Sequence, residues 1–101
     1  MRLSKKYGGL QFFAASFRLE IYSNDGSKLL GSVGTDSTYF YVTETGISGG
    51  DAMGPDWIYN GTKTFLGAST VKNATVPEYE TNSTIPYTVK TVYIVEGGDH
   101  Q

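Results

Sequence analysis

Apolar residues in this chain alternate with polar ones at every second position, in runs too short for a helix. The clearest run covers residues 17–22, in which Phe17, Leu19 and Ile21 alternate with charged side chains. Successive side chains of a strand point to opposite faces, so a period of two predicts a strand with one buried face. Thirteen glycines and eight tyrosines also favour tight turns and pleated surfaces. These patterns together predict an all-β chain.

A β-hairpin is predicted over residues 17–33. Asp25 and Gly26 separate the first strand from a second apolar run at residues 28–33, and this dipeptide tolerates the positive φ that short hairpin turns need. Residues 38–43, which read Thr-Tyr-Phe-Tyr-Val-Thr, predict a third strand because aromatic and β-branched side chains suit a sheet.

The rest of the chain is predicted from its turn residues. Glycine and proline occupy five of the positions from 46 to 55, so this segment is expected to be the longest loop. The dipeptide Asn60-Gly61 then predicts a second hairpin over residues 56–69. Further along, we expect an extended segment at 76–79, a closing strand at 87–95 and a polar, flexible tail at 96–101.

The length of 101 residues predicts a single domain over residues 1–101, because a second core does not fit. We expect a small β-grasp-like or sandwich-like antiparallel sheet domain built from hairpins, with little or no helix. Its parts are an N-terminal arm (1–16), a hairpin with a third strand (17–45), a second half (56–95) and the tail. The apolar stretch at 10–15 follows basic residues as in a signal peptide, but Gln11 interrupts it, so it is expected to remain part of the protein.

The charge balance narrows the classes of partner. The formal net charge is −2 and cysteine is absent. Without an excess of positive charge, neither nucleic acid nor an anionic membrane surface is an expected partner. No segment has the roughly 20 apolar residues of a membrane-spanning helix. A disulfide framework and a thiolate metal site are excluded.

Residues 64–95 carry a resemblance to a known repeat. They contain Thr64-Phe65-Leu66-Gly67-Ala68-Ser69, then Pro77-Glu78-Tyr79, then Thr91-Val92-Tyr93-Ile94-Val95. This order resembles the Listeria–Bacteroides repeat, or internalin B-repeat, also found singly in small phage and prophage virion proteins. The resemblance implies a compact, non-catalytic β domain used for adhesion, spacing or virion architecture. Ala68 stands where the family usually has tryptophan, and Trp57 could supply that ring.

No catalytic, cofactor or metal site is predicted. The single histidine, His100, lies in the glycine-linked tail, where it has no fixed partner. The segment 24–27 has oxygen ligands for calcium but lacks the spaced carboxylates of a calcium loop, so Asp25 is interpreted as a turn residue. Three Asn-x-Ser/Thr triplets, which begin at Asn60, Asn73 and Asn82, are likewise interpreted as turns.

Four aromatic residues form the candidate interface or ligand platform. Tyr39 and Tyr41 share one face of their strand, and Trp57 and Tyr59 share another. Exposed Tyr and Trp are favoured at protein interfaces and on sugar-binding surfaces, because they present rigid area with a polar edge. The alternative is that these rings complete a thin core.

The sequence supports two functional hypotheses. The first is a non-enzymatic structural protein of a bacteriophage virion, for capsid decoration or in a fibre or tail, which binds other virion proteins and copies of itself through its sheet face and termini. The second is an extracellular or cell-surface module that binds host-surface glycan through Trp57 and the tyrosines.

Overall fold

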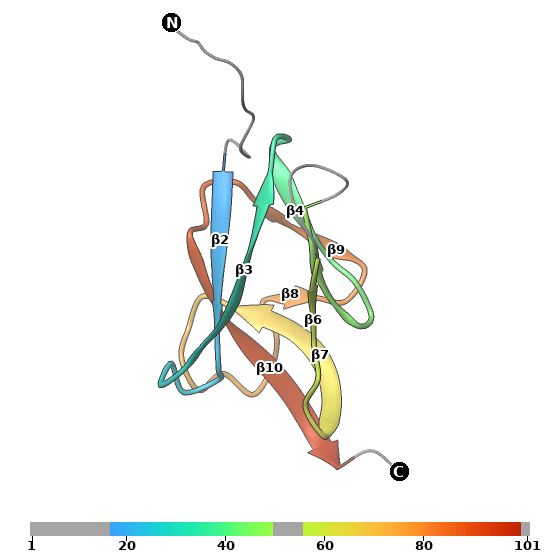
Figure 1. Ribbon diagram of the computed structural model, residues 1–101. Coiled ribbons are helices and arrows are strands. Elements are labelled where there is room, and N and C mark those ends of the chain that lie inside the picture. The colour runs from blue at the N-terminus through green and yellow to red at the C-terminus, as the bar shows by residue number, and fades with distance from the viewer. Residues whose placement is uncertain (1–16, 50–55, 100–101) are drawn as a thin grey trace, which may run out of the picture.

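The computed structural model describes residues 17–49 and 56–99, and within these ranges the chain forms two β-sheets and no helix (Figure 1). The all-β prediction is therefore confirmed. The strands are β2 (Phe17–Tyr22), β3 (Leu29–Thr35), β4 (Tyr39–Val42), β5 (Gly46–Ser48), β6 (Trp57–Ile58), β7 (Lys63–Ser69), β8 (Tyr79–Glu80), β9 (Ser83–Pro86) and β10 (Thr91–Asp99).

The larger sheet has five strands in the order β3-β2-β10-β7-β8. β2 and β3 form the predicted first hairpin, with Leu19 opposite Val33. β10 lies at the centre, antiparallel to β7 but parallel to β2. This is the one parallel pair among the described strands, and the other pairs are antiparallel, as the predicted antiparallel sheet domain requires. The parallel pair joins the two strands that are furthest apart in sequence, so no tight turn forces them to run in opposite directions.

The smaller sheet has four strands in the order β6-β5-β4-β9, all antiparallel. β4 is the predicted aromatic third strand. Its Phe40 pairs with Ile85 of β9, and its Val42 pairs with Ile47 of β5. Both sheets therefore contain strands from the N-terminal and the C-terminal halves of the protein.

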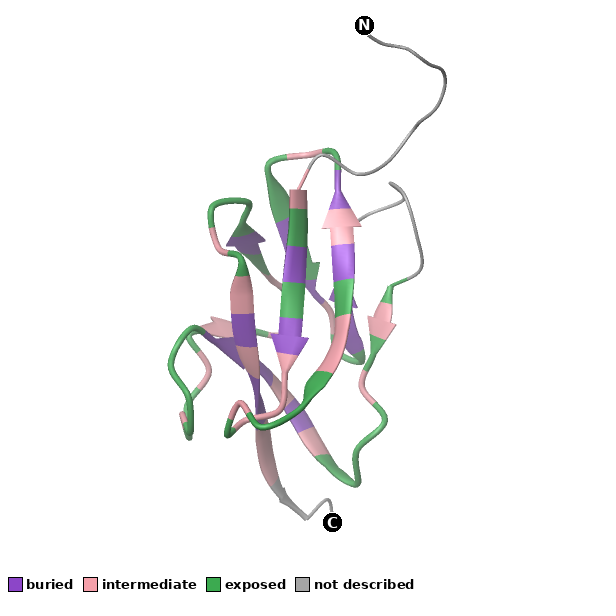
Figure 2. Ribbon diagram, turned by 60° about the vertical axis from the view of Figure 1, so that its left-hand side comes forward, coloured by how far each residue is buried: buried purple, intermediate pink, exposed green. Residues whose placement is uncertain are grey.

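The core lies between the two sheets, where the apolar positions of the alternating strands meet. Figure 2 shows these positions as purple bands that alternate with exposed ones along the strands. Phe40, Leu19 and Ile21 are the largest fully buried side chains, and they belong to both sheets. One continuous cluster joins them to Ile47, Phe65, Ile85, Val92 and Ile94.

The prediction of a long loop at 46–55 is wrong at its start, because residues 46–48 form β5. Glycine permits this pairing: a Cβ atom on Gly46 would collide with the backbone oxygen of Trp57 in β6. Gly49 follows β5, and a Cβ atom on it would likewise collide with the backbone oxygen of Gly34 in β3. The two sheets therefore approach each other closely between the end of β5 and β3. Residues 50–55 lie outside the described residues.

The predicted hairpin over 56–69 is also wrong, because its two strands belong to different sheets. β6 pairs with β5, whereas β7 pairs with β10 and β8. Residues 59–62 thus connect one sheet to the other. The reason is packing: Trp57 and Phe65 both face the core, and they do so from opposite sheets.

The C-terminal predictions need two corrections. The closing strand begins at Thr91 rather than at residue 87, and it continues to Asp99 through most of the segment predicted as a flexible tail. Of the triplet at 82–84, interpreted as a turn from the sequence, only Asn82 lies in a turn, because Ser83 and Thr84 belong to the strand β9. The predicted arm at 1–16 and His100 lie outside the described residues.

Candidate functional site

The outward side of the four-stranded sheet is the candidate functional site, and we call it the tyrosine face. On β4, Phe40 and Val42 are fully buried, so Tyr39 and Tyr41 point away from the core. The strand registers place the outward residues of the other strands beside them. The tyrosine face consists of Tyr39, Tyr41, Ser48, Ile58, Thr84 and Pro86. Ser48 of β5 is buried, whereas the other five residues are exposed.

The two tyrosines hold each other in place. Their ring centroids lie 5.1 Å apart at an interplanar angle of 86°, an edge-to-face contact. The Tyr41 hydroxyl donates a hydrogen bond of 3.2 Å to the Tyr39 hydroxyl. Because that bond needs the proton, it raises the pKa of Tyr41. Two long side chains are thus fixed before any partner binds, which reduces the entropy lost on binding.

The tyrosine face carries no charged group among the described strand positions that point outward. It nevertheless presents large apolar groups, since Tyr39 is 36%, Tyr41 42% and Ile58 58% exposed. The outward side of β2 in the other sheet differs, because it carries Arg18 and Glu20. Protein interfaces combine tyrosine with a central lack of charge, and the tyrosine face has both properties.

Trp57 and Tyr59 lie on the opposite, inner side of the small sheet, where they pack with Phe65. The Trp57 ring meets Phe65 at 6.0 Å and Tyr59 at 6.3 Å, both edge to face, and Tyr59 stacks on Phe65 at 5.3 Å. Trp57 also lies over Gly31 of β3, where a Cβ atom would be only 2.6 Å from the indole Cδ1. This aromatic cluster joins the two sheets.

A short hydrogen bond fixes the polar end of Tyr59. Its hydroxyl donates to the Glu96 carboxylate at 2.6 Å and accepts a 3.3 Å bond from the backbone nitrogen of Lys63. Burial, together with the bond to Glu96, raises the pKa of Tyr59 to about 12. The phenol therefore stays neutral under ordinary conditions.

The four predicted platform residues thus do not form one surface. Tyr39 and Tyr41 stand on the outside of the small sheet, while Trp57 and Tyr59 are half-buried between the sheets. The two exposed rings are also nearly perpendicular, so they cannot both lie flat against one sugar ring.

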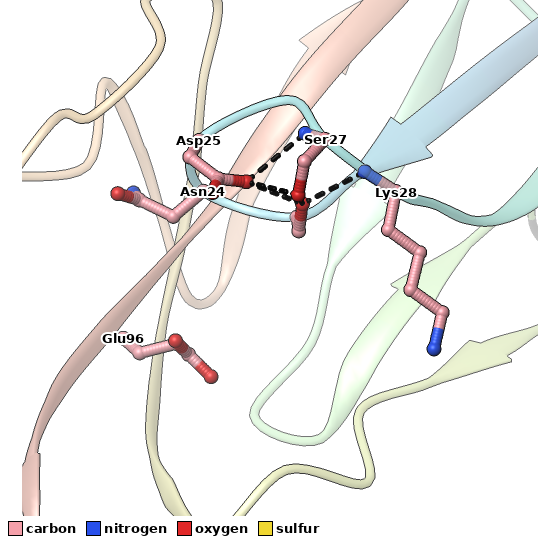
Figure 3. Close-up of a pocket in the computed structure, with 6 residues that line it drawn as sticks. Asn24, Asp25, Ser27, Lys28 and Glu96 are labelled. Carbon is pink, nitrogen blue, oxygen red and sulfur yellow. Dashed lines mark hydrogen bonds between the residues drawn. The ribbon is translucent and has the colours of Figure 1, made fainter.

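A polar depression of about 390 Å³ lies at the turn of the first hairpin (Figure 3). Asp25 accepts hydrogen bonds from the Ser23 hydroxyl (2.9 Å) and from the Ser27 backbone nitrogen (3.0 Å) and hydroxyl (2.7 Å). These bonds, those from Ser27 first, lower the pKa of Asp25 to about 2. Lys28 extends away from this carboxylate in Figure 3. The lining residues are Ser23, Asn24, Asp25, Ser27, Lys28 and Glu96.

The depression is better explained by turn structure than by chemistry. The Asp25 carboxylate already closes its own turn, and the Glu96 carboxylate is held by Tyr59. Asn24 fixes the turn to the rest of the fold, because its amide nitrogen donates to the carbonyl oxygens of Ala74 (3.0 Å) and Ile94 (2.8 Å). Within residues 17–49 and 56–99, no group of three or more His, Cys, Asp or Glu gathers in a way that could hold a metal ion.

Comparisons of the sequence and fold with protein-family models, with curated proteins and with solved structures found no match in any of the three. The resemblance to the B-repeat therefore stays a prediction. No helix in the described part of the protein is long and apolar enough to cross a membrane.

Sequence reasoning missed four members of the tyrosine face, namely Ser48, Ile58, Thr84 and Pro86. The position of Ile58 beside Trp57 in a two-residue strand gave one signal, because neighbouring strand residues point to opposite sides. Thr84 and Pro86 flank the buried Ile85 in the same way. Proline at 86 hid that pattern, since it disfavours a strand prediction.

Proposed function

We propose that this chain is a non-enzymatic structural and binding protein of a bacteriophage virion that binds neighbouring protein subunits through the tyrosine face. The observation that carries the proposal is the uncharged outer surface of the small sheet, with its locked tyrosine pair. The described residues leave the outward groups of β4 and β6 exposed to solvent. The virion assignment itself comes from the resemblance of residues 64–95 to repeats found in virion proteins.

A protein partner fits the tyrosine face better than a glycan does. Sugar rings stack on flat, open aromatic faces, and the best such ring in this protein, Trp57, is packed over Gly31. Protein side chains instead interdigitate with an uneven surface of rings, methyl groups and hydroxyls. Tyr39, Tyr41 and Ile58 provide such a surface.

The size of the face sets the expected strength of binding. Four short strands at about 4.8 Å spacing cover roughly 200–300 Å² of flat area. A stable protein interface buries about 800 Å² per partner, so the tyrosine face is the centre of a larger contact or one of many repeated weak contacts. Repetition on a virion would supply the missing affinity through avidity.

The experiment is sedimentation of the purified protein, alone and with the virion proteins encoded beside it. We expect association that is lost in the double variant Tyr41→Ser with Ile58→Ser. The matched control is Val76→Ser, which removes an equally apolar exposed group (72% exposed) that lies outside the small sheet, between β7 and β8. A strictly monomeric protein that binds no virion protein would contradict the proposal, as would equal loss in the control. A glycan array signal that depends on Tyr41 would favour the second hypothesis instead.

A further inference from the structure

The connection between β6 and β7 contains the one asparagine of this protein that precedes a glycine. The four asparagines are Asn24, Asn60, Asn73 and Asn82, and they precede Asp, Gly, Ala and Ser, respectively. We propose that Asn60 is a site of spontaneous deamidation, which the fold leaves open to solvent and which converts this connection to aspartate and isoaspartate.

The reaction uses only the protein and water. The backbone nitrogen of Gly61 gives its proton to a solvent base and forms a bond to Cγ of Asn60. The bond between Cγ and Nδ2 of Asn60 breaks, and this nitrogen takes up a proton and leaves as ammonia. Water then opens the cyclic imide at one of its two carbonyl carbons, which yields aspartate or isoaspartate.

The structure leaves both reacting groups accessible. Asn60 and Gly61 are exposed and lie outside the strands. Among the interactions of the described residues, neither the Asn60 amide nor the Gly61 N–H takes part in a hydrogen bond. Glycine also has no Cβ atom to hinder the approach of its nitrogen. No local unfolding is therefore needed before the attack.

The dipeptide Asp25-Gly26 could form the same cyclic imide by loss of water. The hydrogen bonds of its turn hold both reacting groups and prevent this reaction. The Gly26 N–H already donates to the Ser23 carbonyl oxygen at 2.8 Å. The hydrogen bonds from Ser23 and Ser27 hold the Asp25 carboxylate in place, and their lowering of its pKa to about 2 keeps it ionised. An ionised carboxylate does not release water to form an imide, so this aspartate should persist.

The remaining asparagines are less reactive for separate reasons. The Asn24 amide is bound to two carbonyl oxygens. The nitrogen that would attack Asn82 belongs to Ser83, which is paired with Val42 in β9. Asn73 is followed by alanine, whose Cβ crowds the attacking nitrogen.

The packing of the Tyr59 ring requires a glycine at position 61, directly after Asn60. A Cβ atom at Gly61 would collide with the Tyr59 hydroxyl and lie 2.5 Å from Cζ of the ring. The glycine that accommodates this ring thus also makes Asn60 reactive. Isoaspartate would lengthen the backbone between Tyr59 and Lys63, so its formation should weaken the bond from the Lys63 nitrogen to the Tyr59 hydroxyl.

The test is to incubate the full protein at mildly alkaline pH, folded and in urea, and to follow each asparagine by peptide mass spectrometry. We expect Asn60 in the folded protein to lose its amide at least about tenfold faster than Asn82, at a rate within about threefold of the urea rate. Isomerisation of Asp25 should be at least about tenfold slower in the folded protein than in urea.

Isoaspartyl methyltransferase labelling identifies the product independently. The variant Asn60→Gln keeps Gly61 and should remove the fast event and the label. The proposal is overturned if Asn60 keeps its amide as long as Asn82 does. It is equally overturned if urea accelerates the loss at Asn60 more than about tenfold, or if the fast event persists in Asn60→Gln.

Discussion

Replacing Trp57 tests the assignment of this residue to the junction between the sheets. The indole packs edge to face with Tyr59 and Phe65 and covers Gly31, so Trp57→Ala removes contacts that join the small sheet to the large one. Tyr41→Ala is the matched control, because its ring contacts Tyr39 on the outer surface. If Trp57 were part of an exposed platform, the two substitutions would have similar effects on folding.

The expected magnitudes differ severalfold. Truncating a fully buried tryptophan costs about 3–5 kcal/mol, and Trp57 is half-buried, so we expect a loss of about 2–3 kcal/mol in the free energy of unfolding. Tyr41 is 42% exposed and should cost no more than about 0.5–1 kcal/mol. A domain of this size is stable by about 5–15 kcal/mol, so both variants should fold.

Urea denaturation followed by far-UV circular dichroism measures both losses. Fluorescence is unsuitable because Trp57 is the single tryptophan. With a slope near 1–1.5 kcal/mol per molar urea, Trp57→Ala should lower the midpoint by about 2 M. Trp57→Phe keeps part of the packing and should lose about half as much. A loss below about 1 kcal/mol for Trp57→Ala, or an equal loss for Tyr41→Ala, would refute the placement of this ring in the core.

Three further outcomes follow from single contacts. Asn24→Ala removes two hydrogen bonds to backbone carbonyl oxygens and should lower the free energy of unfolding, measured by urea titration, by about 1–3 kcal/mol. An unchanged midpoint would mean that these bonds contribute nothing. Because its folded pKa is raised from about 10 to about 12, Tyr59 contributes stability that is fully present below pH 10 and is lost as the pH rises through about 12. Tyr59→Phe should remove about 1–2 kcal/mol of this alkaline dependence in melting curves, whereas an unchanged alkaline slope would exclude Tyr59 as its source. Gly67→Ala should lower the free energy of unfolding by more than about 2 kcal/mol, because Gly67 has φ +140° and an added Cβ atom would collide with the β8 backbone. Wild-type stability of this variant would contradict the geometry.

Elements fixed by local chemistry could be predicted from the sequence. The first hairpin depends on neighbours in sequence: alternation in β2, the Asp25 turn and the returning strand β3. The outward direction of Tyr39 and Tyr41 followed from the burial of Phe40 between them, because adjacent strand residues must face opposite sides.

Elements fixed by distant partners could not be predicted in this way. Asn60 and Gly61 have the chemistry of a hairpin turn, yet β6 and β7 separate because Trp57 and Phe65 must face each other across the core. Gly46 has the chemistry of a loop but belongs to a strand, because its missing Cβ atom lets β6 approach. In both cases the sequence specified what the backbone can do, and packing selected among the possibilities.

The free edge of β9 bears on how a partner would approach the tyrosine face. The Tyr87 nitrogen donates to the Thr38 carbonyl oxygen at 3.0 Å, so the alternate residues Thr84 and Pro86 direct their backbone groups away from β4. Proline has no N–H, so Thr84 offers the one backbone donor along this four-residue edge. Proline and a short strand both oppose the addition of a further strand. A partner that meets the small sheet is therefore directed to its outer face rather than its β9 edge, where side chains rather than backbone groups determine specificity.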